Sequence, residues 1–307
     1  MKRDLRITAL ARLCAVVLVV ALAGCHNGSA KQSADWPDTL DGFRFRWSAE
    51  PSIDLASGPG VPLRAYLESH RVGDMTRSPD DVYPGFDRAV LATGKLMNDP
   101  GPDLPYEIWN IQPATEPLLG DAQKYYGNEY FHVLNLAPID GGYRAYVCDG
   151  LYNVFREGDD SYVSVIKPTE NNVIQGATDP DRFGVKLWRV ELSDQNSGEE
   201  HPASVALSQK GPNPAPANDV FGPWRITGAS PDALWGSQDA PDSTPGGWGR
   251  GELYNELNQQ CLDRMPHDAS QRHDIYTNQL DTPPSAEPAL PGWPSNLLLA
   301  SRSRLGI

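Results

Sequence analysis

The sequence is poor in positive charge, because 26 Lys and Arg residues face 40 Asp and Glu residues in a chain of 307, and the formal net charge is −14. A protein that binds nucleic acid needs clustered basic side chains to meet the phosphates, so this balance argues against a nucleic-acid partner. A long hydrophobic run is also missing. The apolar stretch 13–23 covers about 16 Å as a helix, roughly half of the ~30 Å hydrocarbon core of a bilayer, so we expect no stable membrane span.

Motifs of the common catalytic and cofactor sites are absent, since no G-x-S-x-G, H-E-x-x-H, P-loop or C-x-x-C pattern occurs. The glycine-rich stretch 246–251 follows no strand pattern and predicts a loop rather than a dinucleotide site. The acidic stretch 157–160 lacks the spacing of a calcium-binding loop and predicts a solvated turn. The six histidines are scattered, and the spacing of His267 and His273 does not suit two ligands on one helix face. We therefore expect no cofactor and no bound metal.

The first 25 residues have the order of an export signal. Basic side chains within 2–12 precede the apolar stretch 13–23, and Gly24 and Cys25 follow. The run Leu22-Ala23-Gly24-Cys25 resembles the lipobox of bacterial lipoproteins. The resemblance implies a signal peptide over 1–24, a diacylglyceryl group on the thiol of Cys25, and a fatty acid such as palmitate on the new amino terminus. The alternative is an ordinary cleavable signal in which Cys25 is incidental.

The sequence has only four cysteines, and we expect a different role for the first, the second and the remaining two. Cys14 lies in the signal peptide and Cys25 carries the lipid, which leaves Cys148 and Cys261 in the exported chain. Two remaining thiols in an exported protein usually pair, so we predict a disulfide bond between them. It would close a loop of more than a hundred residues, which corresponds to about 4–5 kcal/mol in the chain-entropy model. The alternative is a reactive thiol at Cys148.

Hydrophobic periodicity predicts a single α+β domain over 41–280, between a flexible tether at 25–40 and a Pro-rich C-terminal segment at 281–307. Gly and Pro number 28 each, which predicts short elements joined by long loops, one of them over 210–223. The turn sequence PIDGG predicts a hairpin between two of the strands. Helices are expected at 61–70, 85–97 and 251–265, and strands at 41–47, 130–136, 143–148, 151–156, 162–166, 185–192 and 224–227.

Parts of this pattern resemble a known superfamily. The order VCDG, VKLWRVEL, WRITG over 147–228 resembles envelope-associated actinobacterial members of the nuclear-transport-factor-two-like superfamily. The stretches 49–54, 64–69 and 83–86 are similar to mycobacterial lipoproteins of unassigned function. The resemblance implies N-terminal helices packed on a curved antiparallel sheet with a cone-like shape. It implies a fold and a location, not an activity.

A few side chains are candidates for a site. Strand residues line the pocket in a cone-shaped fold, so His132, together with Tyr146 or Asp149, could act as an acid–base group. The alternative is that His132 is a hydrogen-bonded core residue. Three tryptophans in Gly/Pro-rich stretches are expected to pin loops to the domain, the alternative being an exposed aromatic surface for a sugar or a protein; they are Trp235, Trp248 and Trp293.

The sequence thus predicts a lipoprotein attached to the cell membrane on its extracytoplasmic side, with the bilayer itself as one partner through Cys25. Without a catalytic signature, we expect a module that binds a small apolar ligand or an envelope protein. The alternative is an enzyme, isomerase-like or hydrolase-like, with an acid–base site in a cone-shaped pocket.

Overall fold

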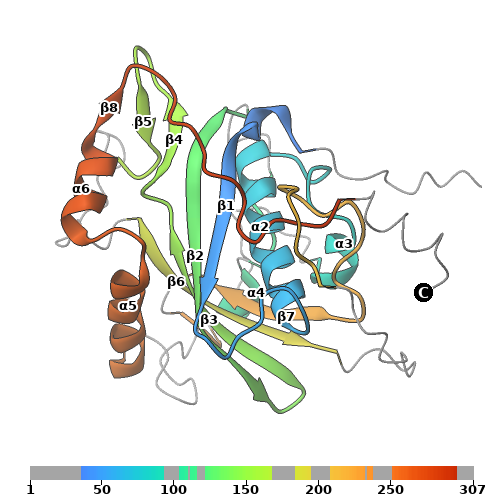
Figure 1. Ribbon diagram of the computed structural model, residues 1–307. Helices are drawn as coiled ribbons and strands as arrows, with labels where there is room; N and C mark the ends of the chain where they lie inside the picture. The colour runs from blue at the N-terminus through green and yellow to red at the C-terminus, as the bar shows by residue number, and fades with distance from the viewer. Residues whose placement is uncertain are drawn as a thin grey trace, which may run out of the picture. The chain divides into compact units, whose positions relative to one another are not determined.

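A computed structural model (Figure 1) describes residues 36–92, 104–109, 111–115, 122–167, 184–194, 208–231, 234–237 and 251–295. The chain divides into two units, Met1–Gln32 and Ser33–Ile307, and every described residue belongs to the second. The predicted α+β class is confirmed. The elements are η1 (Asp38–Leu40), β1 (Gly42–Ala49), α2 (Gly60–Thr76), α3 (Phe86–Ala89), α4 (Tyr106–Trp109), β2 (Tyr125–Ile139), β3 (Gly142–Gly150), β4 (Val154–Glu157), β5 (Tyr162–Ser164), β6 (Val185–Ser193), β7 (Arg225–Ser230), α5 (Glu252–Arg264), α6 (Ala269–Thr277) and β8 (Gln279–Leu280).

The long strand β2 organises a sheet of eight strands. The order is β7-β6-β3-β2-β4-β5-β8, with every pair antiparallel, while β1 pairs with β2 in parallel. β1 pairs with one edge of β2 along 126–133, so β3 and β4 must both pair with the other edge. Along that edge β4 pairs with 125–127 and β3 with 130–139. Two arms of the sheet, β3-β6-β7 and β4-β5-β8, therefore start from the same strand (Figure 1).

The hairpin predicted from PIDGG is confirmed. Ile139 and Gly142 are the last paired residues of β2 and β3, so Asp140 and Gly141 form a two-residue turn. The φ of Gly141 is +84°, a conformation that side chains with a Cβ rarely adopt. The glycine at this position therefore sets the register in which β3 returns along β2.

One face of the sheet packs against α2. Phe43, Phe45 and Trp47 alternate along β1 with half-buried arginines, and the three aromatic rings are almost fully buried. This is the period-2 pattern that the sequence shows over 41–47. Neighbouring strands and α2 fill the same layer with apolar side chains; these include Phe131, Val133, Val147, Trp188, Val190, Leu63, Tyr66 and Leu67.

The opposite face of the sheet packs against α5. Leu257, Cys261 and Met265 of this helix region lie against Cys148 and Leu187 of the sheet in a second apolar cluster. The predicted disulfide is confirmed, because Cys148 and Cys261 are bonded with a Cα–Cα distance of 5.2 Å. In Figure 1 α5 and α6 lie on one side of the sheet and α2 and α3 on the other. Helices thus pack on both faces of the sheet, and the disulfide bonds α5 to its face.

The C-terminal segment, defined here as 281–295, crosses the edge of β1 (Figure 1). Leu290 bridges to β1 through backbone hydrogen bonds, and Gly292 and Trp293 bridge to the loop at 211–213. Trp293 is fully buried, and its Nε1 donates a hydrogen bond to Glu68 of α2 at 2.7 Å. The guanidinium of Arg64 lies 4.1 Å from the centre of the Trp293 ring. The segment is therefore packed into the domain.

Two expectations from the sequence need correction or qualification. The helix expected over 85–97 is shorter, because α3 ends at Ala89 and Val90 is extended and bridges to Ile226 of β7. Val90 is buried at this position, so its tertiary contact overrides the helical pattern. Residues 93–97 lie outside the described ranges. Trp235 and Trp293 are buried, as predicted for loop anchors, while Trp248 lies outside the described ranges.

Candidate functional site

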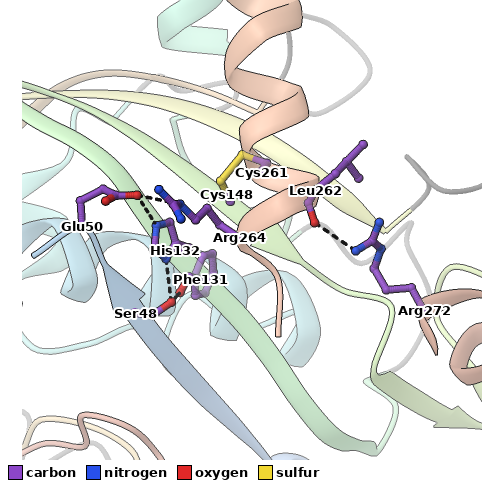
Figure 2. The surroundings of a disulfide bond; sticks show 9 residues. All are labelled: Ser48, Glu50, Phe131, His132, Cys148, Cys261, Leu262, Arg264 and Arg272. Carbon is purple, nitrogen blue, oxygen red and sulfur yellow. Dashed lines mark hydrogen bonds and ion pairs between the residues drawn. A yellow bond between two sulfur atoms is a disulfide. The ribbon is translucent and has the colours of Figure 1, made fainter. Parts of the chain in front are cut away.

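His132 lies on the face of the sheet that α5 covers. It stands opposite Ser48 in the parallel pair β1–β2 and opposite Cys148 in the antiparallel pair β2–β3. The Oγ of Ser48 lies 2.8 Å from Nδ1 of His132, and Oε1 of Glu50 lies 3.4 Å from Nε2. The imidazole therefore sits between a hydroxyl and a carboxylate, one at each nitrogen (Figure 2).

Arg264 completes this group from the other side. Its Nε lies 2.8 Å from Oε1 of Glu50, the same oxygen that faces His132. Arg264 is the last residue of α5 and comes three residues after Cys261, so the disulfide that fastens α5 to β3 also places the guanidinium (Figure 2). We call these four side chains the outer cluster: Ser48, Glu50, His132 and Arg264.

The outer cluster runs from solvent to a buried imidazole. Ser48 is exposed, the side chain of Arg264 is 53% exposed, and that of His132 is only 8% exposed. Burial lowers the pKa of His132 from its ordinary value, because desolvation disfavours the charged imidazolium. The hydrogen bond and charge of Glu50 oppose this shift, and the positive charge of Arg264 adds to it. At neutral pH the ring is therefore mainly uncharged and able to accept a proton.

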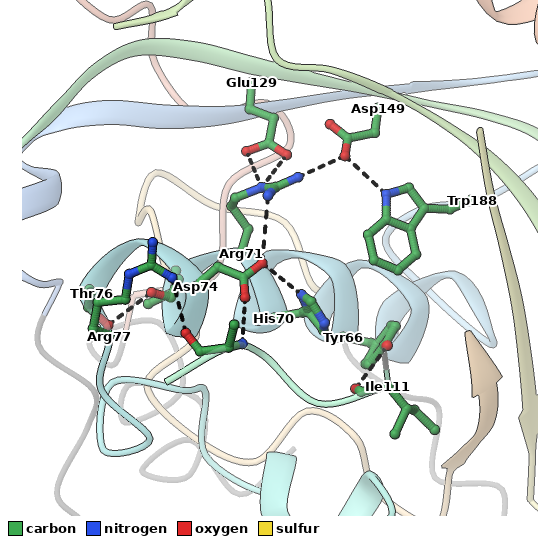
Figure 3. Close-up of polar contacts among 12 residues, drawn as sticks. Tyr66, His70, Arg71, Asp74, Thr76, Arg77, Ile111, Glu129, Asp149 and Trp188 are labelled. Atoms are coloured by element: carbon green, nitrogen blue, oxygen red, sulfur yellow. Dashed lines mark hydrogen bonds and ion pairs between the residues drawn. The ribbon is translucent and has the colours of Figure 1, made fainter. Parts of the chain in front are cut away.

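Asp149 lies on the opposite face of the sheet, beside α2. Its Oδ2 accepts hydrogen bonds from Arg71 at 2.8 Å and from the indole of Trp188 at 3.0 Å. The Nε of Arg71 also contacts both oxygens of Glu129, at 2.8 and 3.1 Å. One guanidinium from α2 thus bridges a carboxylate on β2 and a carboxylate on β3 (Figure 3).

The carboxyl of Glu129 differs in its proton affinity from an ordinary glutamate. Its pKa is raised well above the usual value, first because it is fully buried and also because Asp149 is close, while Arg71 acts in the opposite direction. The Oδ1 of Asp149 is buried and has no hydrogen-bond partner in the part of the chain that the structure describes.

A third carboxylate extends the same network along α2. Asp74 lies 3.2 Å from Nδ1 of His70 and 3.7 Å from Arg71, and it accepts the backbone N–H of Ala114 at 2.7 Å. We call the whole group the inner cluster: His70, Arg71, Asp74, Glu129, Asp149 and Trp188 (Figure 3). Within it Arg71 pairs with all three carboxyl groups, and the contacts tie α2 to the middle of the sheet.

The structure separates the candidate site residues of the sequence. His132 and Tyr146 lie on the face that α5 covers, whereas Asp149 lies on the face that α2 covers. An acid–base pair of His132 with Asp149 is therefore not assembled. Cys25 lies outside the described ranges, and none of the described helices is long and apolar enough to cross a membrane.

Sequence reasoning missed the partners of His132 and of Asp149. Ser48 and Glu50 are two residues apart, a spacing that places them on one side of an extended chain, but the sequence does not show that β2 pairs there. Arg71 sits on a helix that is buried along most of its length, including Arg64 and Glu68, while Arg71 itself is half-buried. Within the described ranges, no group of three or more His, Cys, Asp or Glu side chains has the arrangement to hold a metal ion.

No protein-family model, no curated protein and no solved structure matches this chain.

Proposed function

We propose that the chain is a bacterial lipoprotein, anchored by acyl chains on Cys25 at the extracytoplasmic side of the cell membrane, whose folded domain is a binding module. The observation that carries the proposal is the Cys148–Cys261 bond. Structural disulfides persist in oxidising compartments and are rare in the cytosol. The buried disulfide and the basic and apolar residues at 2–23 both support export of the chain.

The inner cluster favours binding over catalysis for the α2 side of the sheet. Arg71 is engaged by three carboxylates, so its charge is compensated within the protein. A network of this kind holds a helix in a fixed position, which suits a rigid module that presents its surface to an envelope protein or a small apolar ligand.

We further propose that the sheet is the curved, cone-like sheet of the nuclear-transport-factor-two-like superfamily. Two features support this. Both arms of the sheet start from β2, and α2 packs against the face that contains Trp47, Phe131 and Trp188. An experimental structure of the domain tests this proposal, and a flat sheet would contradict it.

Mass spectrometry of the mature amino terminus, combined with membrane fractionation, tests the anchoring. We expect the chain in the membrane fraction, beginning at Cys25 and carrying a diacylglyceryl group and a fatty acid, and we expect Cys25→Ala to be released. Cys14→Ala is the matched control, since this cysteine lies in the same leader and should leave the lipid unchanged. An unmodified Cys25, or a Cys25→Ala chain retained in the membrane, would contradict the proposal.

Affinity purification from the native envelope tests the binding role. The lipidated chain should enrich one protein or one extractable apolar compound. The Cys25→Ala chain, mixed with detergent-solubilised envelope, should enrich the same protein or compound. Such a result would place the contact on the folded domain rather than on the lipid. Enrichment that is lost with the lipid would contradict a binding module.

A further inference from the structure

The geometry points to a reactive serine outside the binding role: we propose that Ser48 is a nucleophile, that His132 is its base, and that carboxylic esters are the class of substrate. This proposal does not depend on the lipid anchor or on a binding partner. It concerns the outer cluster alone, on the face of the sheet that α5 covers.

The position of Ser48 is fixed by strand pairing. Ser48 and His132 are register partners in the parallel pair β1–β2, so their side chains leave the sheet next to each other. The distance of 2.8 Å from Oγ to Nδ1 is within the range expected between a nucleophile and its base. Ser48 is an exposed residue, so an ester meets it at the surface of the domain.

Glu50 decides which nitrogen of His132 acts as the base. A carboxylate accepts hydrogen bonds, so its position at Nε2 favours the tautomer with the proton on that nitrogen. The lone pair of Nδ1 then faces the hydroxyl of Ser48. A nucleophile, a base and an orienting acid in contact define a serine-hydrolase site by geometry, whatever their order in the sequence.

Arg264 and the disulfide hold the orienting acid in place. The guanidinium contacts the same oxygen of Glu50 that faces His132, so Glu50 is fixed from two directions. Because α5 is bonded to β3 at Cys261, one turn before Arg264, this contact is tied to the sheet.

The proposed reaction has two steps. The Oγ of Ser48 attacks the ester carbonyl while its proton passes to Nδ1 of His132; the C–O bond to the alcohol then breaks, and the alcohol leaves with that proton. This leaves an acyl group on Ser48. A water molecule then gives a proton to Nδ1 and attacks the acyl carbon. The bond between the acyl carbon and Oγ breaks, Oγ takes the proton back from Nδ1, and the carboxylic acid is released.

A fluorophosphonate probe tests the nucleophile directly, because it forms an Oγ–P bond with loss of fluoride. The purified full-length chain is treated with the probe, and the modified peptide is located by mass spectrometry. We expect labelling at Ser48 and none in Ser48→Ala. Ser57→Ala is the matched control, since the hydroxyl of Ser57 contacts a carboxylate of Asp54 but no imidazole, and labelling should continue in it. Thermal melting establishes that each variant is folded.

The roles of the other three residues are tested by rate and pH. We expect His132→Asn to slow labelling by about a hundredfold, the lower end for the loss of a general base. Glu50→Gln should move the midpoint of the pH profile of labelling downward, because Glu50 raises the pKa of His132, and Arg264→Gln should move it upward. A merely structural role for the two residues would not move the midpoint in opposite directions.

Hydrolysis of p-nitrophenyl acetate, lost in Ser48→Ala and kept in Ser57→Ala, would support the full reaction. No labelling at Ser48, or equal labelling with and without His132, would overturn the proposal. Either result would leave the anchoring by Cys25 unaffected, because that proposal is tested by the mass of the amino terminus.

Discussion

The disulfide between Cys148 and Cys261 offers a quantitative test of how α5 is held. We consider a chain in which both cysteines are replaced by alanine, so that no unpaired thiol remains in the described domain. The two cysteines are 113 residues apart. For a loop of this length the chain-entropy model gives about 16 cal/mol/K, or about 5 kcal/mol at 25 °C, which the double variant should lose.

The loss should be concentrated in α5. Only three side chains of this helix are buried, namely Leu257, Asn258 and Cys261, and one of them is the bonded cysteine. The side chains of α2 are almost all buried, so packing holds that helix in place. With so little buried surface, α5 depends more on its covalent link to stay in place. We therefore expect the amides of α5 to exchange hydrogen much faster in the double variant than in the wild type.

Urea unfolding followed by circular dichroism measures the total loss, and hydrogen exchange with mass spectrometry locates it. Treatment of the wild type with a thiol reductant should reproduce the behaviour of the double variant, and the same reductant should leave the double variant unchanged. A loss in the free energy of unfolding of less than about 1 kcal/mol, or unchanged exchange in α5, would refute the reasoning.

Three further predictions concern the buried charges and the C-terminal segment. Arg71→Met should lower the free energy of unfolding by about 3–5 kcal/mol in urea titrations, because it leaves Glu129 and Asp149 facing each other without their cation. Glu129→Gln should flatten the pH dependence of the free energy of unfolding. The folded state holds the proton of Glu129 more tightly than the unfolded state does. The stability that this proton contributes is therefore present below pH 4.5 and is lost as the pH rises toward the raised pKa. Urea titrations at a series of pH values check this. Trp293→Ala should cost about 3–5 kcal/mol in thermal or urea unfolding, and limited proteolysis should then cut within 281–295, because the variant empties a buried site and removes the hydrogen bond to Glu68.

Local patterns in the sequence account for much of the fold. The alternation over 41–47 predicts β1, and the Asp-Gly turn predicts the β2–β3 hairpin, because both depend on neighbours within a few residues. The helix expected over 251–265 matches α5 closely. The disulfide is also predictable, since exclusion of Cys14 and Cys25 leaves one possible pair.

The outer and inner clusters could not be predicted from the sequence, because they depend on contacts between segments that are far apart in the chain. Ser48 meets His132 only through a parallel pairing of strands that lie 84 residues apart, and nothing in either strand specifies that register. Arg71 meets Glu129 and Asp149 only once α2 has packed on the sheet. Helical periodicity failed at Val90 for the same reason, since its bridge to β7 outweighs the local preference.

The covered edge of β1 has a consequence for biosynthesis. Translation delivers the chain from its amino end, so β1 is complete long before the residues that shield it arrive. Until Leu290 and Trp293 emerge, an open strand with three aromatic side chains has no partner on one side. Polypeptides truncated before residue 290 should therefore form intermolecular β-pairs and accumulate as aggregates.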